Sequence, residues 1–466
     1  MLFERFEDKG LSQYSYAIGC EGCGEIAVVD PRRDTDIYLE FAHARGLRIV
    51  AVLETHIHAD FASGARALAQ QTDADLLLSA YDEGELYEVS FPHTATRDGD
   101  VLTLGKTRLV ALHTPGHTPE HLSFLAYDLA RAPQVPQLML SGDFLFVGSL
   151  GRPDLIGDAM KLQLAGQLYD SVREKLGPLP DGLEVHPGHG AGSMCGSGMS
   201  ARPMTTLGFE RLANRYLAAD LTRDAFIEDI LAQVPPFPPY YKRMKVLNVK
   251  GADPLEDLPG QDAIAARDFH TLVESGHVIV DLRDQLSFGA GHIPGAFGIG
   301  ATGSLSTWAG WVVPPDAPIL LVASGPDQVP DAVRALLRVG LDDVRGYLDG
   351  GMEKWIGAGY PVTHIREVTP GEFVNVRGEE PMFVVDVRTK DEFGTGLVPG
   401  ARNILGGHLA DRVAELPRDG TPIAVICGTG YRSTVAASVL ERAGFPEVVN
   451  IIGGMAAWRQ SGLPTE

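Results

Sequence analysis

An internal repeat in the second half of this 466-residue chain constrains its fold more than any other feature. VIVDLRDQLSFGAGHIPGA (278–296) matches VVDVRTKDEFGTGLVPGA (384–401), which places Asp281 and Asp386 105 residues apart. LDGGMEKW (348–355) likewise matches IIGGMAAW (451–458) at a separation of 103 residues. Each copy alternates short apolar runs with helical patterns. The repeat therefore predicts two small α/β domains, each wound around a parallel sheet.

The first half has a different pattern and predicts a separate, mixed α/β domain. Runs such as EIAVVD (25–30) and RIVAVLETH (48–56) alternate with helical segments. GADPLEDLPGQD (251–262) is rich in proline, glycine and acid, so we interpret it as a linker. We therefore predict one domain over residues 1–250, followed by repeat copies over 263–363 and 366–466.

Composition excludes some classes of partner. The formal net charge of −22 argues against binding to nucleic acid or to an anionic membrane. The N-terminus lacks the apolar segment of a secretory signal, and no apolar run reaches the ~18 residues of a membrane span. Four cysteines do not make a disulfide framework. We expect a cytoplasmic protein, and a homo-oligomer is compatible with these data.

Residues of the kinds that bind metals follow apolar runs at four places in the first domain. The segments are THIHAD (55–60), TPGHT (114–118), SGDF (141–144) and HPGHG (186–190). Polar side chains at the ends of neighbouring strands meet at one edge of a sheet, and histidine with carboxylate is a common metal-ligand set. The sequence therefore predicts a metal site made from His56, His58, Asp60, His117, Asp143 and His189.

This set resembles the metallo-β-lactamase superfamily, in which two sheets pack face to face between helices. The resemblance implies an αββα fold for the first domain. Binuclear hydrolases of that family usually carry the pattern HxHxDH, but here the last position is Phe61. A phenyl ring has no lone pair to donate to a metal. We therefore expect a single metal ion.

The sequence is similar to the persulfide dioxygenase branch of that family, which uses one iron(II). The resemblance implies one Fe(II) per chain, bound by His56, His117 and Asp143, with His58, Asp60 and His189 orienting these ligands. The residues alone leave His58 and Asp143 open as the third ligand. We predict substrate contacts from Arg152, Cys195, Tyr240 and Arg243. For Arg152 a salt bridge to Asp154 is an equal alternative, and Cys195 fits an incidental loop cysteine equally well.

Cys20 and Cys23 form CEGC before an apolar run. A CxxC pair is found in redox and zinc sites, but no second pair completes a zinc site here. The stretch falls at an early turn of the fold. We therefore predict a structural role for both cysteines.

Cys427 lies between the apolar run PIAVI and the helical pattern STVAASVLERAGF. Backbone N–H groups of such a loop, the N-terminus of the following helix and the charge of Arg432 all favour thiolate over thiol. CGTGYR (427–432) resembles the active loop of rhodanese sulfurtransferases, and the resemblance covers 366–466. It implies Cys427 and Arg432 as catalytic residues, with substrate contacts from Gly428, Thr429, Gly430 and Tyr431. Dual-specificity phosphatases have a similar but longer loop.

The earlier copy carries ASGPDQVP (323–330) at the same place. A shift of 103 residues pairs Ser324 with Cys427 and Val329 with Arg432, whereas a shift of 104 pairs Ala323 with Cys427. Either register lacks both nucleophile and charge. We predict an inactive, structural rhodanese-like domain.

Together the resemblances imply a persulfide dioxygenase fused to a sulfurtransferase. It would oxidise a thiol persulfide of glutathione or coenzyme A type with O2 to sulfite, and form or consume thiosulfate through Cys427. Two alternatives stay open. One is a binuclear zinc thioester hydrolase of the glyoxalase II type, and the other is a non-catalytic sulfur relay protein.

Overall fold

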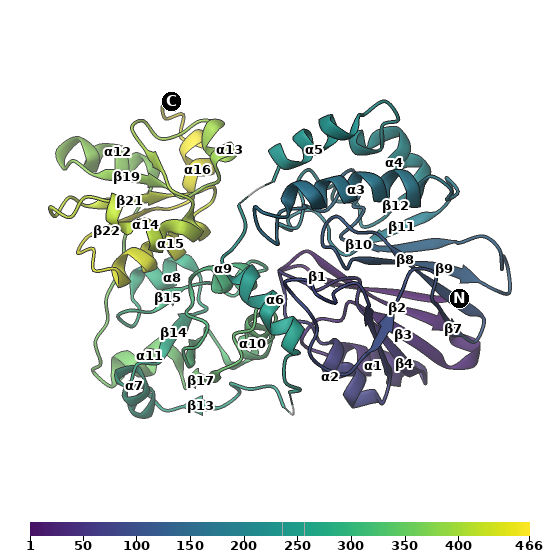
Figure 1. The fold of residues 1–466 in the computed structure, drawn as a ribbon. Coiled ribbons are helices and arrows are strands. Elements are labelled where there is room, and N and C mark those ends of the chain that lie inside the picture. Colours follow the sequence, from purple (N-terminus) through teal and green to yellow (C-terminus); the bar gives the residue numbers. More distant parts are fainter. Residues whose placement is uncertain (235, 256) are drawn as a thin grey trace. The chain divides into compact units, whose positions relative to one another are not determined.

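The computed structural model describes residues 1–234, 236–255 and 257–466, and Figure 1 traces their ribbon. Pro235 and Glu256 lie outside that description, the second of them within the predicted linker. The chain divides into two compact units. The first comprises Met1–Glu256 with Leu337–Gly340, and the second comprises Asp257–Leu336 with Leu341–Glu466.

The first sheet of the first unit has the order β1-β2-β3-β4-β5-β6. Its first two pairings are antiparallel and the remaining three are parallel. Its strands are β1 (Leu2–Asp8), β2 (Gln13–Cys20), β3 (Glu25–Val29), β4 (Arg48–Leu53), β5 (Asp75–Ser79) and β6 (Thr94–Thr96).

The second sheet of this unit has the order β12-β11-β10-β9-β8-β7. Its pairings are antiparallel except for β10 with β11, which is parallel. Its strands are β7 (Val101–Leu104), β8 (Thr107–His113), β9 (Leu122–Asp128), β10 (Leu138–Gly142), β11 (Glu184–Pro187) and β12 (Thr205–Thr206).

Three apolar clusters make this unit a four-layer αββα sandwich. The central cluster joins the two sheets, for example Ile18 and Leu53 from one and Phe124 from the other. The outer clusters place helices against the opposite faces of the sheets, with Leu68 on one side and Leu168 on the other. The helices are α1 (Asp36–Arg45), α2 (Ala65–Thr72), α3 (Lys161–Leu176), α4 (Leu207–Ala213), α5 (Arg223–Ala232) and α6 (Tyr240–Lys250).

The second unit contains two five-stranded parallel sheets with the same pattern of strand order, β13-β17-β16-β14-β15 and β18-β22-β21-β19-β20. This confirms the repeat. The strands are β13 (Ala263–Ile264), β14 (Val278–Asp281), β15 (Phe297–Gly298), β16 (Ile319–Val322), β17 (Val344–Leu348), β18 (Arg366–Val368), β19 (Phe383–Asp386), β20 (Arg402–Asn403), β21 (Ile423–Ile426) and β22 (Val448–Ile451).

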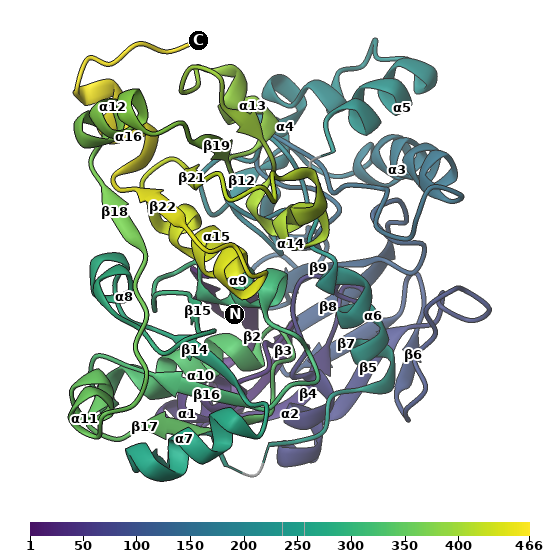
Figure 2. The same ribbon diagram turned by 90° about the vertical axis from the view of Figure 1, so that its left-hand side faces the viewer.

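Helices cover both faces of these sheets, which explains why the central strands are uninterrupted apolar runs. In the second copy, Phe373 and Trp458 pack on one face with Val384 and Ile426. Helix α15 lies along β22 and β21, as Figure 2 shows. The helices are α7 (Ala266–Glu274), α8 (Gln285–Ala290), α9 (Leu305–Val312), α10 (Val329–Leu337), α11 (Gly351–Gly357), α12 (Pro370–Glu379), α13 (Lys390–Gly394), α14 (Leu409–Arg412), α15 (Tyr431–Arg442) and α16 (Gly454–Gln460).

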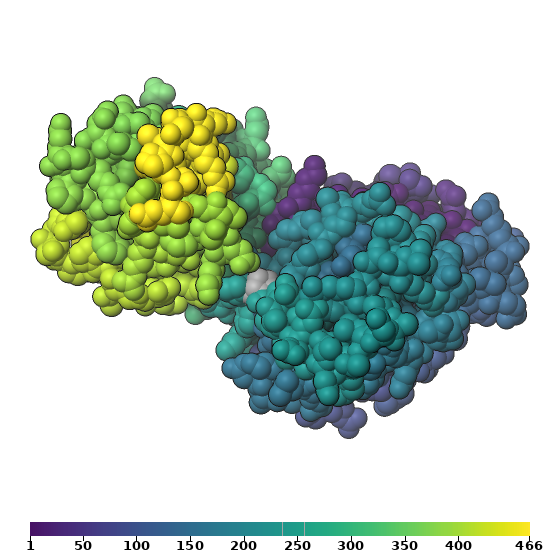
Figure 3. Space-filling model, turned by 90° about the horizontal axis from the view of Figure 1, so that it is seen from above, coloured from purple at the N-terminus to yellow at the C-terminus, as the bar shows by residue number. Residues whose placement is uncertain are grey.

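A tryptophan anchors the last helix of each copy. The indole N–H of Trp355 donates to the carbonyl of Pro361 at 2.8 Å, and that of Trp458 donates to Pro464 at 3.0 Å. Both rings are almost fully buried. Glu466 then exchanges two backbone hydrogen bonds with Leu397, and Figure 3 shows this last stretch in yellow at the surface of the second unit.

None of the described helices is both long and apolar enough to cross a bilayer.

Truncating one anchor should unfold its copy more readily. We expect Trp355→Ala to lower the free energy of unfolding by about 3–5 kcal/mol, because it leaves a large cavity in the core. The neighbouring Ile356 is 57% exposed, so Ile356→Ala is the matched control and should have little effect. Urea unfolding followed by tryptophan fluorescence checks this, since all four tryptophans lie in the second unit. Equal stability of the two variants would contradict the prediction.

Candidate active sites

The first site is built where three strands of the first unit end. His56 follows β4, His117 follows β8 and Asp143 follows β10. One ligand atom from each of these residues lies within 4.8 Å of the others, and all three side chains are buried. The sequence predicted these strand ends, and the structure brings these three side chains together.

The donor atoms of this cluster have the properties expected of metal ligands. Nε2 of His56 lies 3.9 Å and Nε2 of His117 lies 3.6 Å from Oδ2 of Asp143. None of these three buried atoms has a hydrogen-bond partner, although buried polar atoms are normally paired. Two neutral imidazoles and a carboxylate facing one point fit a divalent metal ion.

Neighbouring groups fix the orientation of each candidate ligand. The carbonyl of Arg152 accepts a hydrogen bond from Nδ1 of His117 at 2.9 Å, which leaves Nε2 as the lone-pair donor. Nδ1 of His56 lies 2.9 Å from Oγ1 of Thr55. The backbone N–H of Asp143 donates to Nε2 of His121 at 3.0 Å. His121 was not predicted, although it lies four residues after His117.

His189 lies between two carboxylates. Its Nδ1 is 2.7 Å from Oδ1 of Asp143 and its Nε2 is 2.7 Å from Oδ2 of Asp60. Burial alone would lower the pKa of His189, but the two carboxylates raise it well above its usual range. Both ring nitrogens are occupied, so His189 orients Asp143 and does not face the metal position.

Phe61 occupies the place where a binuclear site would need a histidine. Its ring is fully buried and lies against His58, with the ring centroids 4.3 Å apart. Nε2 of His58 is directed at Oδ1 of Asp30, 3.2 Å away. Asp30, which also accepts from the backbone N–H and the hydroxyl of Thr55, was not predicted. It too follows a strand, β3, which is the signal that could have found it.

Helix α6 holds the 55–61 loop by two side chains that sequence reasoning missed. Nζ of the buried Lys245 donates to the carbonyl of Ile57 at 2.9 Å. The side-chain amide of Asn248 donates to the carbonyls of His58 and Phe61, both at 2.8 Å.

Two residues of α6, Tyr240 and Arg243, were predicted as substrate contacts, and for both that role stays a prediction. Tyr240 is buried, which raises the pKa of its phenol well above the usual range. Arg243 donates to the carbonyls of Val339 and Gly340, which belong to the same unit.

Arg152 and Cys195 lie beside the metal cluster. The guanidinium of Arg152 makes two hydrogen bonds to Asp154, at 2.7 and 2.8 Å, so the salt bridge weighed from the sequence is present. Cys195 is 1% exposed, and one ligand atom from each of Cys195, Asp60 and His189 lies within 4.8 Å of the others. Burial raises the pKa of the Cys195 thiol well above its usual range.

The second site is the loop between β21 and α15. Cys427 is fully buried, and its sulfur accepts a hydrogen bond from the backbone N–H of Gly430 at 3.0 Å. Oγ of Ser433 lies 3.5 Å from the sulfur. Thr429, at the outer edge of the loop, is exposed. The loop therefore directs the backbone amide of Gly430 at the sulfur, whose thiol in turn faces the hydroxyl oxygen of Ser433.

Arg432 is paired with a carboxylate that was not predicted. Its two terminal nitrogens bind the two oxygens of Glu392 at 2.7 and 2.6 Å. The hydrogen bonds from Arg432 lower the pKa of Glu392 to about 2. The sequence implied an unshielded positive charge beside the sulfur, whereas the structure has an ion pair there. The guanidinium lies close to the loop: a β-carbon placed on Gly428 would be only 3.0 Å from Nη2 of Arg432.

Comparison with known families agrees with this geometry. Residues 8–189 match the family model of the metallo-beta-lactamase superfamily, and residues 265–358 and 369–461 each match that of the rhodanese-like domain. A crystal structure of a metallo-beta-lactamase from Staphylococcus aureus subsp. aureus COL is 35% identical. The match covers 74% of this chain and 98% of that one, with a TM-score of 0.65. The chain belongs to the metallo-beta-lactamase superfamily. It carries a tandem of rhodanese-like domains in addition.

Curated relatives of the metallo-beta-lactamase domain are named as hydrolases. Hydroxyacylglutathione hydrolase of Polaromonas sp. is 32% identical over 191 residues, which are 41% of this chain and 66% of that protein. Hydroxyacylglutathione hydrolase GloC of Haemophilus influenzae is 28% identical over 209 residues, which are 41% of this chain and 86% of that protein. The chain thus spans just under two thirds of the length of the first of these relatives.

The strand pairing decides the register between the two rhodanese-like domains. Asp281 pairs with Val322 in the first, and Asp386 pairs with Ile426 in the second. Val322 and Ile426 therefore correspond, and the next residues are Ala323 and Cys427. The same shift of 104 places Gln328, not Val329, opposite Arg432. At Asp281 and Asp386 the shift is 105, and this shift places Ser287 opposite Glu392. Both residues lie three positions after the N-cap of a helix, and both bind that N-cap residue.

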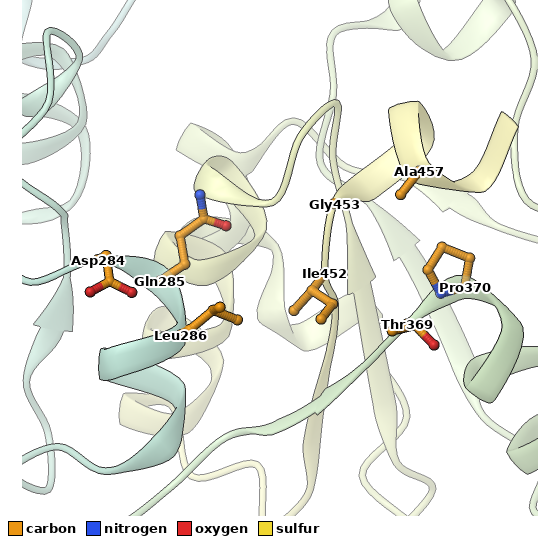
Figure 4. A pocket seen from close by; sticks show the side chains of 8 residues that line it. All are labelled: Asp284, Gln285, Leu286, Thr369, Pro370, Ile452, Gly453 and Ala457. Atoms are coloured by element: carbon orange, nitrogen blue, oxygen red, sulfur yellow. The ribbon is translucent and has the colours of Figure 1, made fainter. Parts of the chain in front are cut away.

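The first rhodanese-like domain contacts the loop of residues 427–432, here called the sulfur loop, directly. The hydroxyl of Tyr431 donates to the carbonyl of Gly300 at 3.0 Å. Gly430 has φ of 108°, and a β-carbon there would overlap Oε1 of Gln285. Beside this contact lies a cavity of about 490 Å³ lined by both domains. Figure 4 shows the side chains that line it. Its lining residues are Asp284, Gln285, Leu286, Thr369, Pro370, Ile452, Gly453 and Ala457.

Removing one candidate ligand should abolish metal binding at the first site. We expect His117→Ala to lose the ion that the wild-type protein retains after dialysis, because the remaining ligands no longer form a three-donor set. His43 is exposed and is the matched control, since His43→Ala should keep the ion. The number of metal ions per chain, measured by inductively coupled plasma mass spectrometry, decides the outcome. Retention of the ion by His117→Ala would exclude this cluster as the binding site.

Removing the negative charge of Glu392 should lower the reactivity of Cys427. We expect Glu392→Gln to lower kcat/KM for sulfur transfer by about tenfold, because a hydrogen bond to a charged group is worth about 1.5–3 kcal/mol. Glutamine can keep the capping hydrogen bonds to Thr389, so the unfolding midpoint should stay unchanged. Ser287→Ala, at the equivalent position of the inactive domain, is the control. An unchanged kcat/KM in Glu392→Gln would show that the ion pair is not needed.

Proposed function

We propose that the metallo-beta-lactamase unit is a persulfide dioxygenase and that the second rhodanese-like domain is a sulfurtransferase. The substrate of the first would be a low-molecular-weight thiol persulfide of glutathione or coenzyme A type, with O2 as oxidant and sulfite as product. The second would transfer sulfane sulfur through Cys427 and so form or consume thiosulfate.

The observation that carries the first assignment is the replacement of a second metal ligand by Phe61 beside a complete set of two histidines and one carboxylate. This ligand set leaves open positions on a non-haem iron(II). Iron(II) bound there would supply the activation of O2 and of the persulfide sulfur. Zinc has no redox chemistry and could not do so.

The chain's own groups would orient and enclose this site. The Arg152 carbonyl fixes the tautomer of His117, and His189 fixes the rotation of the Asp143 carboxylate. Lys245 and Asn248 hold the loop that carries His56. The buried Cys195 lies beside Asp60 and His189, close to this ligand set.

At the second site the loop would stabilise sulfur anions. The Cys427 thiolate attacks the outer sulfur of a persulfide, so that the S–S bond of the donor breaks, the donor leaves as thiolate, and Cys427 becomes a persulfide. Sulfite then attacks the outer sulfur, thiosulfate leaves, and the Cys427 thiolate is regenerated. Gly430 N–H would donate to the sulfur that carries the charge.

Thioester hydrolysis is the second candidate for the first unit, because the curated relatives are named hydroxyacylglutathione hydrolase. A binuclear centre of that kind needs a further ligand at the position of Phe61. The aromatic ring packed on His58 argues against it.

Metal identity and O2 consumption together test the proposal. We expect the purified protein to contain iron and to consume O2 with glutathione persulfide. Bound zinc, cleavage of a glutathione thioester and no O2 consumption would favour the hydrolase instead.

The Cys427→Ser variant tests the sulfurtransferase assignment. It should lose thiosulfate formation from persulfide and sulfite but keep O2 consumption, because the two reactions use different residues. Ser324→Ala, in the corresponding loop of the inactive domain, is the control and should keep both. Thiosulfate formation at full rate by Cys427→Ser would exclude Cys427 as the sulfur carrier.

A further inference from the structure

Two cysteines of the first unit are used by neither site and lie against each other. Cys20 is the last residue of β2, and Cys23 ends the short turn Glu21–Cys23 that follows. Their sulfur atoms are 2.6 Å apart. Cys20 is buried, whereas Cys23 is exposed. One sulfur of the pair is therefore accessible to a solute and the other is shielded behind it.

The hairpin between β7 and β8 is shaped around this pair. Gly105 at its tip has φ of 53°, and a β-carbon there would overlap Sγ of Cys23 and lie 2.9 Å from Sγ of Cys20. The backbone amide of Lys106 lies within hydrogen-bonding reach of both sulfurs. The hydroxyl of Thr107 donates to the carbonyl of Gly19 at 2.7 Å and ties the hairpin to β2. These contacts distinguish the pair from cysteines that are neighbours only in sequence.

The pair lies at the opposite end of the sheet from the metal cluster. Because β2 is antiparallel to β3, Cys20 pairs with Glu25 at the start of β3. The groups that face the metal cluster follow the other ends of the strands, such as His56 after β4. The cysteine pair therefore belongs to a separate site.

We propose that Cys20 and Cys23 are a redox-active dithiol that small molecules containing a sulfur–sulfur bond oxidise to a disulfide. Such molecules include symmetrical disulfides and persulfides. This role goes beyond the structural one expected for CEGC from its sequence. This inference is independent of the activities proposed above.

The reaction balances with either oxidant. The Cys23 thiolate attacks the S–S bond of a disulfide RSSR, forms a mixed disulfide and releases one thiolate. Cys20 then attacks the Cys23 sulfur and releases the second, so that the dithiol loses two electrons and two protons and RSSR becomes two RSH. With a persulfide RSSH, Cys23 takes the outer sulfur and releases RSH. Cys20 then displaces that sulfur as hydrogen sulfide.

The hydrogen bond between the sulfurs couples their protonation. It lowers the pKa of Cys20 and raises that of Cys23, so Cys20 is the base that takes the proton of Cys23 and makes the exposed sulfur the attacking thiolate. The proton can pass between the sulfurs across their hydrogen bond. The exposed sulfur attacks, and the buried one resolves the mixed disulfide.

Mass spectrometry of the full chain tests the proposal in a Cys427→Ser background, which removes the sulfur loop's own thiol. After incubation with glutathione disulfide, we expect the peptide with Cys20 and Cys23 to lose two hydrogen atoms and to carry no glutathione. The Cys20→Ser variant should accumulate a glutathione adduct on Cys23, and Cys23→Ser should not accumulate one on Cys20. With glutathione persulfide the same disulfide should form with release of hydrogen sulfide.

Two glycine variants test whether disulfide formation depends on the shape of the hairpin around the cysteines or only on their closeness in the sequence. Gly105→Ala should slow closure of the disulfide, because its β-carbon takes the space of the Cys23 sulfur. Gly22→Ala, in the same turn but with open space around it, should close normally. The proposal is overturned if the dithiol stays reduced under conditions that modify Cys23 in Cys20→Ser, or if Cys23 reacts in neither protein.

Discussion

The hydrogen bond between His189 and Asp143 is the contact on which the chemistry of the first unit depends. It occupies Oδ1 of the aspartate and leaves Oδ2 directed at the two histidines. His189 is itself held by Asp60 on its other nitrogen, so the carboxylate cannot rotate without breaking a buried, charge-assisted bond. Strand ends deliver the three ligand side chains to one place, but this chain of two hydrogen bonds decides which atoms face the metal position.

The tandem repeat offers an internal comparison of a sulfur loop with and without its chemistry. Three side chains differ together at equivalent positions: Cys427 against Ala323, Arg432 against Gln328, and Glu392 against Ser287. The strand that precedes the loop pairs in the same way in both copies, but the loops themselves differ: a short turn, Pro326–Gln328, stands where the second copy has Gly430 with φ of 108°. Gln328 binds the backbone of its own loop, where it accepts from the N–H of Ser324 at 3.0 Å. The loop of the first copy is thus closed on itself, while that of the second copy is held by an ion pair from a separate helix.

Much of this could be predicted from the sequence, because strand ends and repeats leave local patterns. The two parallel-sheet domains and the meeting of metal-binding residues at strand ends follow from apolar runs and from the residues that end them. The αββα fold and the choice of Asp143 over His58 came from the family resemblance. Two of the missed groups, Glu392 and Lys245, have no such pattern. Glu392 lies 40 residues from Arg432, and Lys245 lies 188 residues from Ile57, so only folding brings them together.

The register of the repeat failed to follow from sequence for a different reason. The separation between equivalent residues is 105 at Asp281, 104 at the sulfur loop and 103 at Trp355, because the connections between elements differ in length. A single shift taken from one matched segment therefore misplaces the next one by a residue. Strand pairing removes this ambiguity, since hydrogen bonding counts residues from a fixed partner on the neighbouring strand.

Phe61 connects the chemistry of the first unit to its electrostatics. Asp143, Asp60 and Asp30 are buried carboxylates, and buried charges are stable only when they are paired. A second metal ion would supply positive charge to such a group of carboxylates, but a phenyl ring in the ligand position disfavours one. Here His189 lies between two of the carboxylates with a raised pKa, and His58 faces the third, whose charge likewise raises the pKa of His58. These histidines thus face the buried carboxylates that lie around the ligand set, and His56, His117 and Asp143 keep their unpaired donor atoms directed at one point.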